Sequence, residues 1–170
     1  MPLRALRPWL PLILGIGLVS CGQRPEPDAP CAKLAKLVDR QLGSPEAPVR
    51  VVTFLPVNNG CQDVIGEYLA DVAERFPAVF QVRILAMKSP AAKERMESSQ
   101  IHCAAVMVNG KTTFDLGGEE GRFILEGPMD PRDVVRALAA AAHEALGDQA
   151  PELPPAPEQP GIENMPKRTF

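Results

Sequence analysis

The sequence lacks the motifs of several large functional classes. It contains only two histidines, and no Ser-His-Asp, His-Glu-x-x-His or paired-carboxylate arrangement is supported by its spacing. The glycine-rich residues 117–121 include two carboxylates and no lysine, so they do not form a phosphate-binding loop. Lysine and arginine are scattered rather than clustered, which argues against a nucleic-acid partner.

Long hydrophobic runs are also missing. The apolar stretch at residues 9–19 is shorter than the roughly 20 apolar residues that a membrane-spanning helix needs. It follows Arg4 and Arg7, and the first twenty residues include no acidic side chain. A basic start, a short apolar run and small residues at its end are typical of a secretory signal. We therefore expect residues 1–20 to be a signal peptide.

The end of this segment, Leu-Val-Ser-Cys at residues 18–21, resembles the lipobox of bacterial lipoproteins. The resemblance implies cleavage before Cys21, a diacylglycerol on its sulfur and an acyl chain such as palmitate on its new amine. Several acyl chains hold a protein on a membrane more firmly than one chain does. The expected location is a bacterial membrane facing the periplasm or the cell exterior. By analogy with enteric bacteria, Gly22 favours the outer membrane where one exists.

Removal of residues 1–20 leaves an acidic chain. It takes Arg4 and Arg7 from the 18 basic residues and none of the 21 acidic ones, which gives a formal charge of −5. An acidic chain is not attracted electrostatically to anionic lipid, so the acyl chains are expected to supply the membrane attachment.

Cysteine is scarce, and its count is informative. With Cys21 assigned to lipid, Cys31, Cys61 and Cys103 remain, an odd number for an oxidising compartment. At most one intramolecular disulfide can form among them, and all three pairings are open. Cys31 shares the apolar face of a predicted helix, where core packing is its expected role.

Composition divides the exported chain into three parts. Residues 21–30 join the lipidated cysteine to a proline-rich tether, and residues 148–170 hold six prolines and are expected to be a disordered tail. Residues 31–147 are the expected folded domain.

Within that domain, the hydrophobic spacing predicts alternating helices and strands. The expected elements are a helix over residues 31–42, a buried strand Val49–Leu55, a helix over 61–76, a strand over 80–87, a helix over 90–99, a strand over 103–108, an Asn109-Gly110 turn with a returning strand 111–116, a further strand over 122–126 and a helix from the Asp130 cap to Gly147. This order predicts an α/β fold with parallel strand pairs and an antiparallel hairpin at one edge.

The layout resembles the thioredoxin fold across most of residues 31–147. The resemblance rests on an apolar strand, a short loop, a cysteine that starts an amphipathic helix, and a later apolar strand ending in Asn-Gly. It implies a three-layer α/β/α sandwich with a mixed central sheet. The family's Cys-x-x-Cys is Asn58-Asn59-Gly60-Cys61 here, with only the second cysteine kept. Asn58, Asn59 and Gly60 are expected to shape this loop.

The second departure from the family concerns the loop before residue 103. Family members carry a cis-proline there, opposite the active-site cysteines, whereas this chain has no proline in residues 100–104. The resemblance implies that this loop lies beside the start of the helix that holds Cys61. Cys103 is then a second thiol facing the first from a different segment.

Three interpretations of this pair are open. In the first, Cys61 and Cys103 form a disulfide, either redox-active with a thiol-containing protein partner or structural; closing a loop of about 40 residues contributes roughly 3–4 kcal/mol. The start of a helix stabilises a Cys61 thiolate, although Asp63 and Glu67 oppose it. In the second, Cys61, His102 and Cys103 bind Cu(I) or Zn, although adjacent residues of a strand face opposite sides.

In the third interpretation, the domain has lost its chemistry and serves as a non-catalytic binding module on the same fold. The absence of both family hallmarks, the first cysteine and the cis-proline, favours it. Of the three, thiol chemistry at Cys61 and Cys103 is the function that we predict, and it requires no cofactor.

Overall fold

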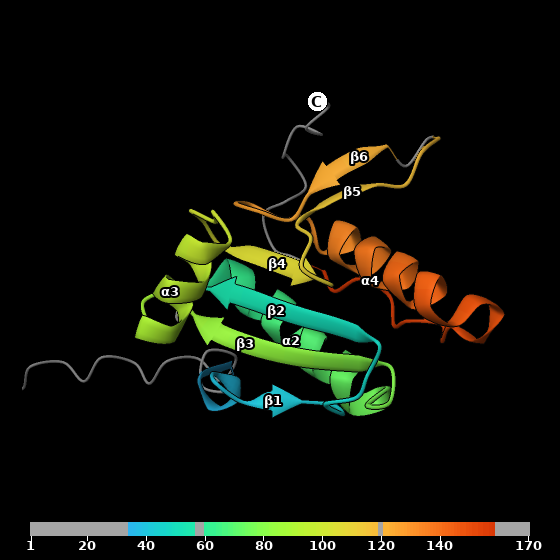
Figure 1. The fold of residues 1–170 in the computed structure, drawn as a ribbon, viewed down its shortest axis with the longest axis horizontal. Coiled ribbons are helices and arrows are strands. Elements are labelled where there is room, and N and C mark those ends of the chain that lie inside the picture. Colours follow the sequence, from blue (N-terminus) through green and yellow to red (C-terminus); the bar gives the residue numbers. More distant parts are fainter. Residues whose placement is uncertain (1–33, 57–59, 119–120, 159–170) are drawn as a thin grey trace, which may run out of the picture.

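The computed structural model describes residues 34–56, 60–118 and 121–158, with only the backbone of residues 60–63 (Figure 1). The predictions for Cys21, Cys31, Asn58 and Asn59 therefore lie outside the described residues. The elements are β1 (Gln41–Leu42), β2 (Val49–Leu55), α2 (Gly60–Arg75), β3 (Phe80–Ala86), α3 (Pro90–Ser98), β4 (Ala105–Val108), β5 (Thr113–Asp115), β6 (Arg122–Ile124), α4 (Pro131–Leu146) and the short 3-10 helix η1 (Gly147–Gln149).

Four strands form one mixed sheet, in the order β1-β3-β2-β4. The central strands β2 and β3 run parallel, and Val51 is paired with Val82. Strand β1 runs antiparallel to β3, and β4 runs antiparallel to β2. The predicted α/β class and the mixed sheet are confirmed.

Helices cover both faces of this sheet (Figure 1). Alternate side chains of a strand point to opposite faces, so Val49, Val51 and Leu55 of β2 enter the larger core, which also includes side chains of α2 and α4. Phe54 points the other way, into a smaller core with Ala92 and Met96 of α3. Helices α2 and α4 thus pack against one face and α3 against the other.

The hairpin after β4 differs in part from the prediction. Asn109 and Gly110 both have positive φ, 50° and 80°, and Lys111 pairs with Val108 across the predicted turn. Beyond that pair, the expected return along β4 is wrong, because β5 pairs with β6 in a separate two-stranded sheet. The stacked rings of Phe114 and Phe123, 5.6 Å apart, favour this pairing.

The segment before β2 also differs from the prediction. The expected helix over residues 31–42 does not reach Leu42, because Gln41 and Leu42 form β1. Asp39 has a φ of 62°, which turns the chain from helical residues 34–37 into this strand. Gly43 has a φ of 76°, and a Cβ atom there would lie 1.9 Å from the Phe80 carbonyl oxygen. The strand therefore leaves through a turn that only glycine fits.

The fold continues past Gly147, where the composition had suggested a tail with little to pack. Ala150 and Leu153 pack against the larger core. The Tyr68 hydroxyl of α2 donates a hydrogen bond to the Pro154 carbonyl oxygen at 2.9 Å. Among the described residues, none of the helices combines the length and the apolar character needed to cross a bilayer.

Candidate functional site

The first part of the candidate site is the start of α2. Strand β2 ends at Leu55, and the helix begins at Gly60, which places Cys61 in its first turn. Backbone N–H groups in the first turn of a helix have no partner within the helix, and the helix dipole is positive there. The predicted helix start, one residue from Cys61, is confirmed, while the Cys61 side chain is outside the described atoms.

The second part is the loop from Ile101 to Ala104. It leaves α3 through Gln100, whose φ is 56°. The Ile101 N–H donates to the Met96 carbonyl and the Gln100 N–H to the Glu97 carbonyl, at 2.9 and 3.1 Å. These two bonds form a Schellman motif, and the side chains of Ile101 and Met96 share the smaller core beneath it. The direction in which the chain leaves α3 is therefore fixed.

Cys103 lies in this loop, and its thiol is free and exposed. The loop is not part of the sheet, because β4 begins at Ala105 rather than at residue 103 as predicted. The expected opposition of His102 and Cys103 across a strand is therefore wrong, and both residues are exposed. Exposure of the thiol is required for any chemistry with a second sulfur.

Glu126 holds this loop in place. Its Oε1 atom accepts hydrogen bonds from the backbone N–H groups of His102 and Cys103, at 2.9 and 3.3 Å. Hydrogen bonds from backbone N–H groups to a carboxylate oxygen are stronger than hydrogen bonds between neutral groups. The carboxylate thus orients the peptide that carries the Cys103 side chain.

Backbone pairing delivers Glu126 to this position. Glu126 lies opposite Ala105 in an antiparallel bridge, and the Gly127 N–H donates to the Ala104 carbonyl oxygen at 2.7 Å. The Val106 N–H donates to the Leu125 carbonyl oxygen at 3.0 Å. Residues 125–127 therefore take the place beside β4 that the sequence had assigned to residues 111–116.

The sheet topology brings the two parts of the site to one end of the molecule. Phe54, near the end of β2, is paired with Ala105, the first residue of β4. A buried hydrogen bond from the Thr53 hydroxyl to the Ala105 carbonyl oxygen, at 3.0 Å, strengthens this contact. The chain enters α2 and Cys61 from the same sheet end at which Cys103 precedes β4. A sulfur–sulfur contact between the two cysteines stays a prediction.

The described side chains do not form a cluster of metal ligands. Among residues with described side chains, no group of three or more His, Cys, Asp or Glu is arranged to hold a metal ion. His102 contributes its backbone N–H to Glu126, and its ring is on an exposed residue. The proposed ligand set of Cys61, His102 and Cys103 stays untested, because the structure does not describe the Cys61 side chain.

The two cysteines and His102 were predicted from the sequence as site residues, whereas Glu126 was not. The only local signal for Glu126 was a carboxylate at the end of a predicted strand, which is typical of many exposed positions. Its role depends on residues 125–127 returning to β4, a long-range pairing that no spacing in the sequence indicates.

Comparisons of the chain with known protein families, with curated proteins and with solved structures found no match.

Proposed function

We propose that this protein is a membrane-anchored, extracytoplasmic thiol protein of thioredoxin-like fold that uses Cys61 and Cys103. In this proposal, Cys21 carries the lipid, residues 22–30 form the tether, and the domain faces the periplasm or the cell exterior. The observation that carries the proposal is an exposed thiol, Cys103, at the sheet end from which the chain enters α2.

The arrangement of the sheet supports the thioredoxin-like part of the proposal. Strands β2 and β3 are parallel and joined through α2, and β4 lies antiparallel on the other side of β2. Helices α2 and α4 share one face and α3 covers the other. This arrangement supports the three-layer α/β/α sandwich with a mixed central sheet that the resemblance implies, although β5 pairs with β6 instead of returning along β4.

The proposed chemistry is thiol–disulfide exchange with a disulfide of a protein partner. The Cys61 thiolate attacks one sulfur of the partner, so that a mixed disulfide forms and the other partner sulfur leaves as a thiolate, which takes up a proton. The Cys103 thiolate then attacks Cys61 in the mixed disulfide. The partner leaves as a dithiol, reduced by two electrons, and the protein holds a Cys61–Cys103 disulfide. A partner dithiol reverses both steps.

The alternative is a non-catalytic binding module on the same fold. Asn58 stands where the family's first cysteine stands, so exchange within one motif is not available. If Cys61 and Cys103 do not take part in disulfide exchange, this departure from the family motif favours the binding module over thiol chemistry. Soft-metal binding by Cys61, His102 and Cys103 is the third candidate.

The test is equilibration of the exported chain with glutathione redox buffers, followed by mass spectrometry of trapped thiols. We expect a Cys61–Cys103 bridge whose population follows the buffer potential, and the same behaviour in the matched control C31S. A bridge that resists reduction is structural and favours the binding module. Three free thiols with stoichiometric copper or zinc favour the metal interpretation, and either result overturns the exchange proposal.

A further inference from the structure

The sheet face on the α3 side is only partly covered. Helix α3 is nine residues long and packs over Phe54, Leu85 and Ala105, at the end of the sheet near the loop from Ile101 to Ala104. The strand register leaves two further rows of side chains on this face beyond the helix. One row is Gln41, Arg83, Val52 and Met107, and the next is Arg50 and Gln81. The Asn109 side chain accepts a hydrogen bond from the Arg50 N–H beside this second row.

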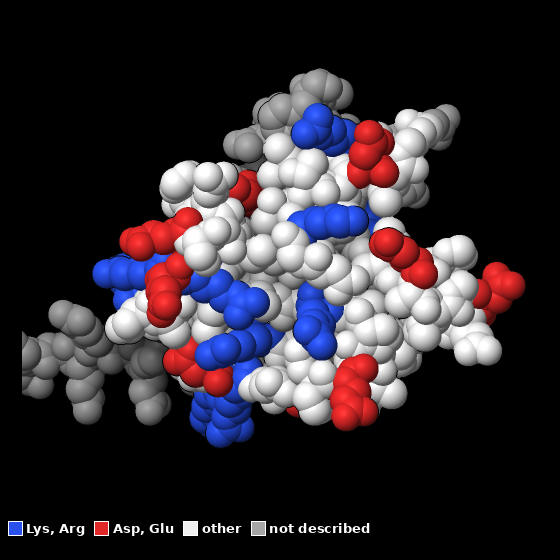
Figure 2. Space-filling view, in the orientation of Figure 1, with Lys and Arg blue, Asp and Glu red and all other residues white. Residues whose placement is uncertain are grey.

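These rows carry positive charge and no carboxylate. Arg50 and Arg83 are exposed, and neither forms an ion pair with another residue that the structure describes. Figure 2, viewed from this side, shows lysine and arginine side chains gathered where β2 and β3 run. Distant segments of the chain thus assemble an arginine group that the sequence, with its scattered basic residues, does not indicate.

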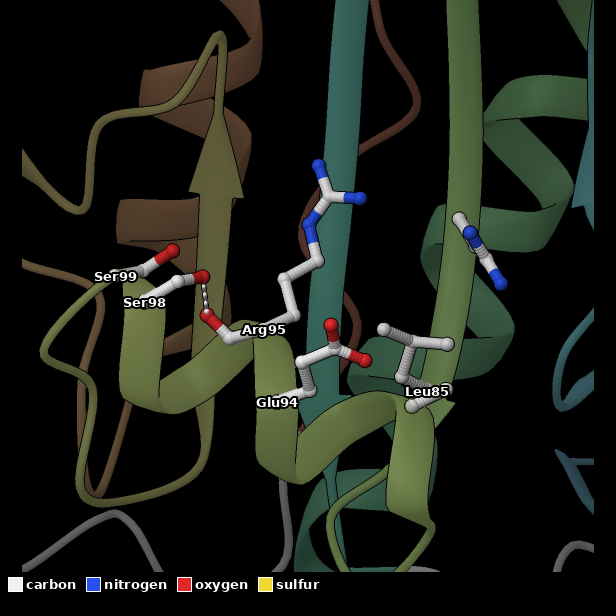
Figure 3. A pocket seen from close by; sticks show the side chains of 7 residues that line it. Leu85, Glu94, Arg95, Ser98 and Ser99 are labelled. Carbon is white, nitrogen blue, oxygen red and sulfur yellow. Dashed lines mark hydrogen bonds between the residues drawn. The ribbon is translucent and has the colours of Figure 1, made fainter.

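Helix α3 adds a third guanidinium group. The Arg95 side chain reaches away from the helix and lies in front of β2, as Figure 3 shows. Arg83 and Arg95 line an open hollow of about 540 Å³ between α3 and β3, together with Leu85 and the serines Ser98 and Ser99. Glu94 also lines it and is the single carboxylate among its lining residues.

The spacing of the arginines suits an extended chain. Arg83 lies opposite Val52, so Arg50 and Arg83 are offset by two residues along neighbouring strands. Strand geometry puts that two-residue repeat at about 7 Å, which is also the spacing of alternate side chains in an extended peptide. The half-buried Val52 and Met107 lie in the same row as Arg83 and offer apolar contact between the charges.

We propose that this arginine face, formed by Arg50, Arg83 and Arg95, binds an extended acidic peptide segment of a partner protein. Without residues 1–20 the chain has a formal charge of −5, so long-range electrostatics oppose the approach of an acidic peptide. Attraction therefore has to be local to this face. Because the charges are exposed, binding weakens as salt screens them.

The proposal is tested with a labelled short peptide in which glutamate and threonine alternate. The peptide is titrated into the mature protein, which begins at Cys21, in non-ionic detergent. We expect saturable binding that weakens with salt and a much weaker response to the same peptide with glutamine in place of glutamate. R83Q and R95Q should each weaken binding by about two- to fivefold, the range for exposed charge pairs.

Two matched variants sharpen the test. E94Q removes the one carboxylate of the hollow and should strengthen binding, whereas R122Q removes an exposed arginine of β6, outside the arginine face, and should change nothing. Equal effects of R83Q and R122Q would contradict the proposal. So would binding to phosphatidylglycerol vesicles or to inorganic phosphate that exceeds binding to the peptide. None of these readouts involves a cysteine, so failure here leaves the proposed thiol function intact.

Discussion

The Glu126 carboxylate and the Cys103 backbone are joined by a hydrogen bond of 3.3 Å from the Cys103 N–H to Oε1. The same oxygen accepts from His102 at 2.9 Å. Since Cys103 lies in a loop outside the sheet, this pair of bonds and the flanking bond from the Gly127 N–H to the Ala104 carbonyl oxygen hold the backbone that carries its side chain. Glu126 is in this sense a positioning residue for the candidate thiol chemistry.

Replacement of Glu126 by alanine should loosen the loop. E126A leaves the two N–H groups to water, and we expect a loss of about 1–2 kcal/mol in the free energy of unfolding. E126Q keeps an acceptor oxygen without its charge and should lose less. Denaturant unfolding measures both changes. Alkylation of Cys103 in the reduced, natively folded protein should be altered in E126A and closer to wild type in E126Q. Identical behaviour of all three proteins would contradict the positioning role.

Replacement of Gln100 by glycine should stabilise the folded protein. Its φ of 56° is in the left-handed region, where a side chain is strained and glycine is not. We expect Q100G to raise the free energy of unfolding by about 1 kcal/mol. The control is Q159G, which changes the same residue type outside the described fold. A destabilised Q100G would mean that the Gln100 side chain contributes contacts that outweigh the strain.

Because the Tyr68 hydroxyl is buried, we expect a specific loss of stability at alkaline pH. Burial, and secondarily the charge of Asp71, raises the pKa of Tyr68 to about 12, against about 10 for an ordinary tyrosine. The folded state therefore keeps its proton where the unfolded state releases it. This contribution to stability is complete below pH 10 and is lost as the pH rises from about 10 through 12.

The alkaline titration is simple to read because Tyr68 is the only tyrosine in the sequence. Its phenolate absorbance in the folded protein should appear near pH 12, and the stability of Y68F should not show this loss between pH 10 and 12. Y68F should also be about 1 kcal/mol less stable at neutral pH, because its ring cannot donate to the Pro154 carbonyl. An ordinary titration near pH 10 would show that residues 150–154 do not cover this hydroxyl.

Local patterns predicted most of the regular elements. Val49–Leu55 is β-branched and apolar, and it forms β2 over those same residues. Ser89 caps α3 by accepting from the Ala92 N–H, and Asp130 caps α4 by accepting from the Arg132 N–H, at 3.2 and 2.9 Å. These signals lie within a few residues of the structure that they specify, so the sequence alone is enough to read them.

Long-range pairing accounts for what the sequence did not predict. The helical spacing that continues to Leu42 gives way to β1 because β3 offers Gln41 and Leu42 an open edge. Residues 113–115 pair with β6, and Glu126 then returns to the Cys103 loop. Leu153 packs although it lies in a proline-rich segment, because the core of α2 and α4 accepts it. Apart from the β5–β6 hairpin, whose strands are close in the sequence, each outcome depends on a partner far away in the sequence.

The most direct test of the account is the disulfide map of the exported protein, purified without reductant, with thiols blocked at once and peptides identified by mass spectrometry. We predict a bridge between Cys61 and Cys103, with Cys31 unpaired, and loss of that bridge on mild reduction. A map in which Cys103 is blocked as a thiol, or is joined to Cys31, would contradict the proposed pair.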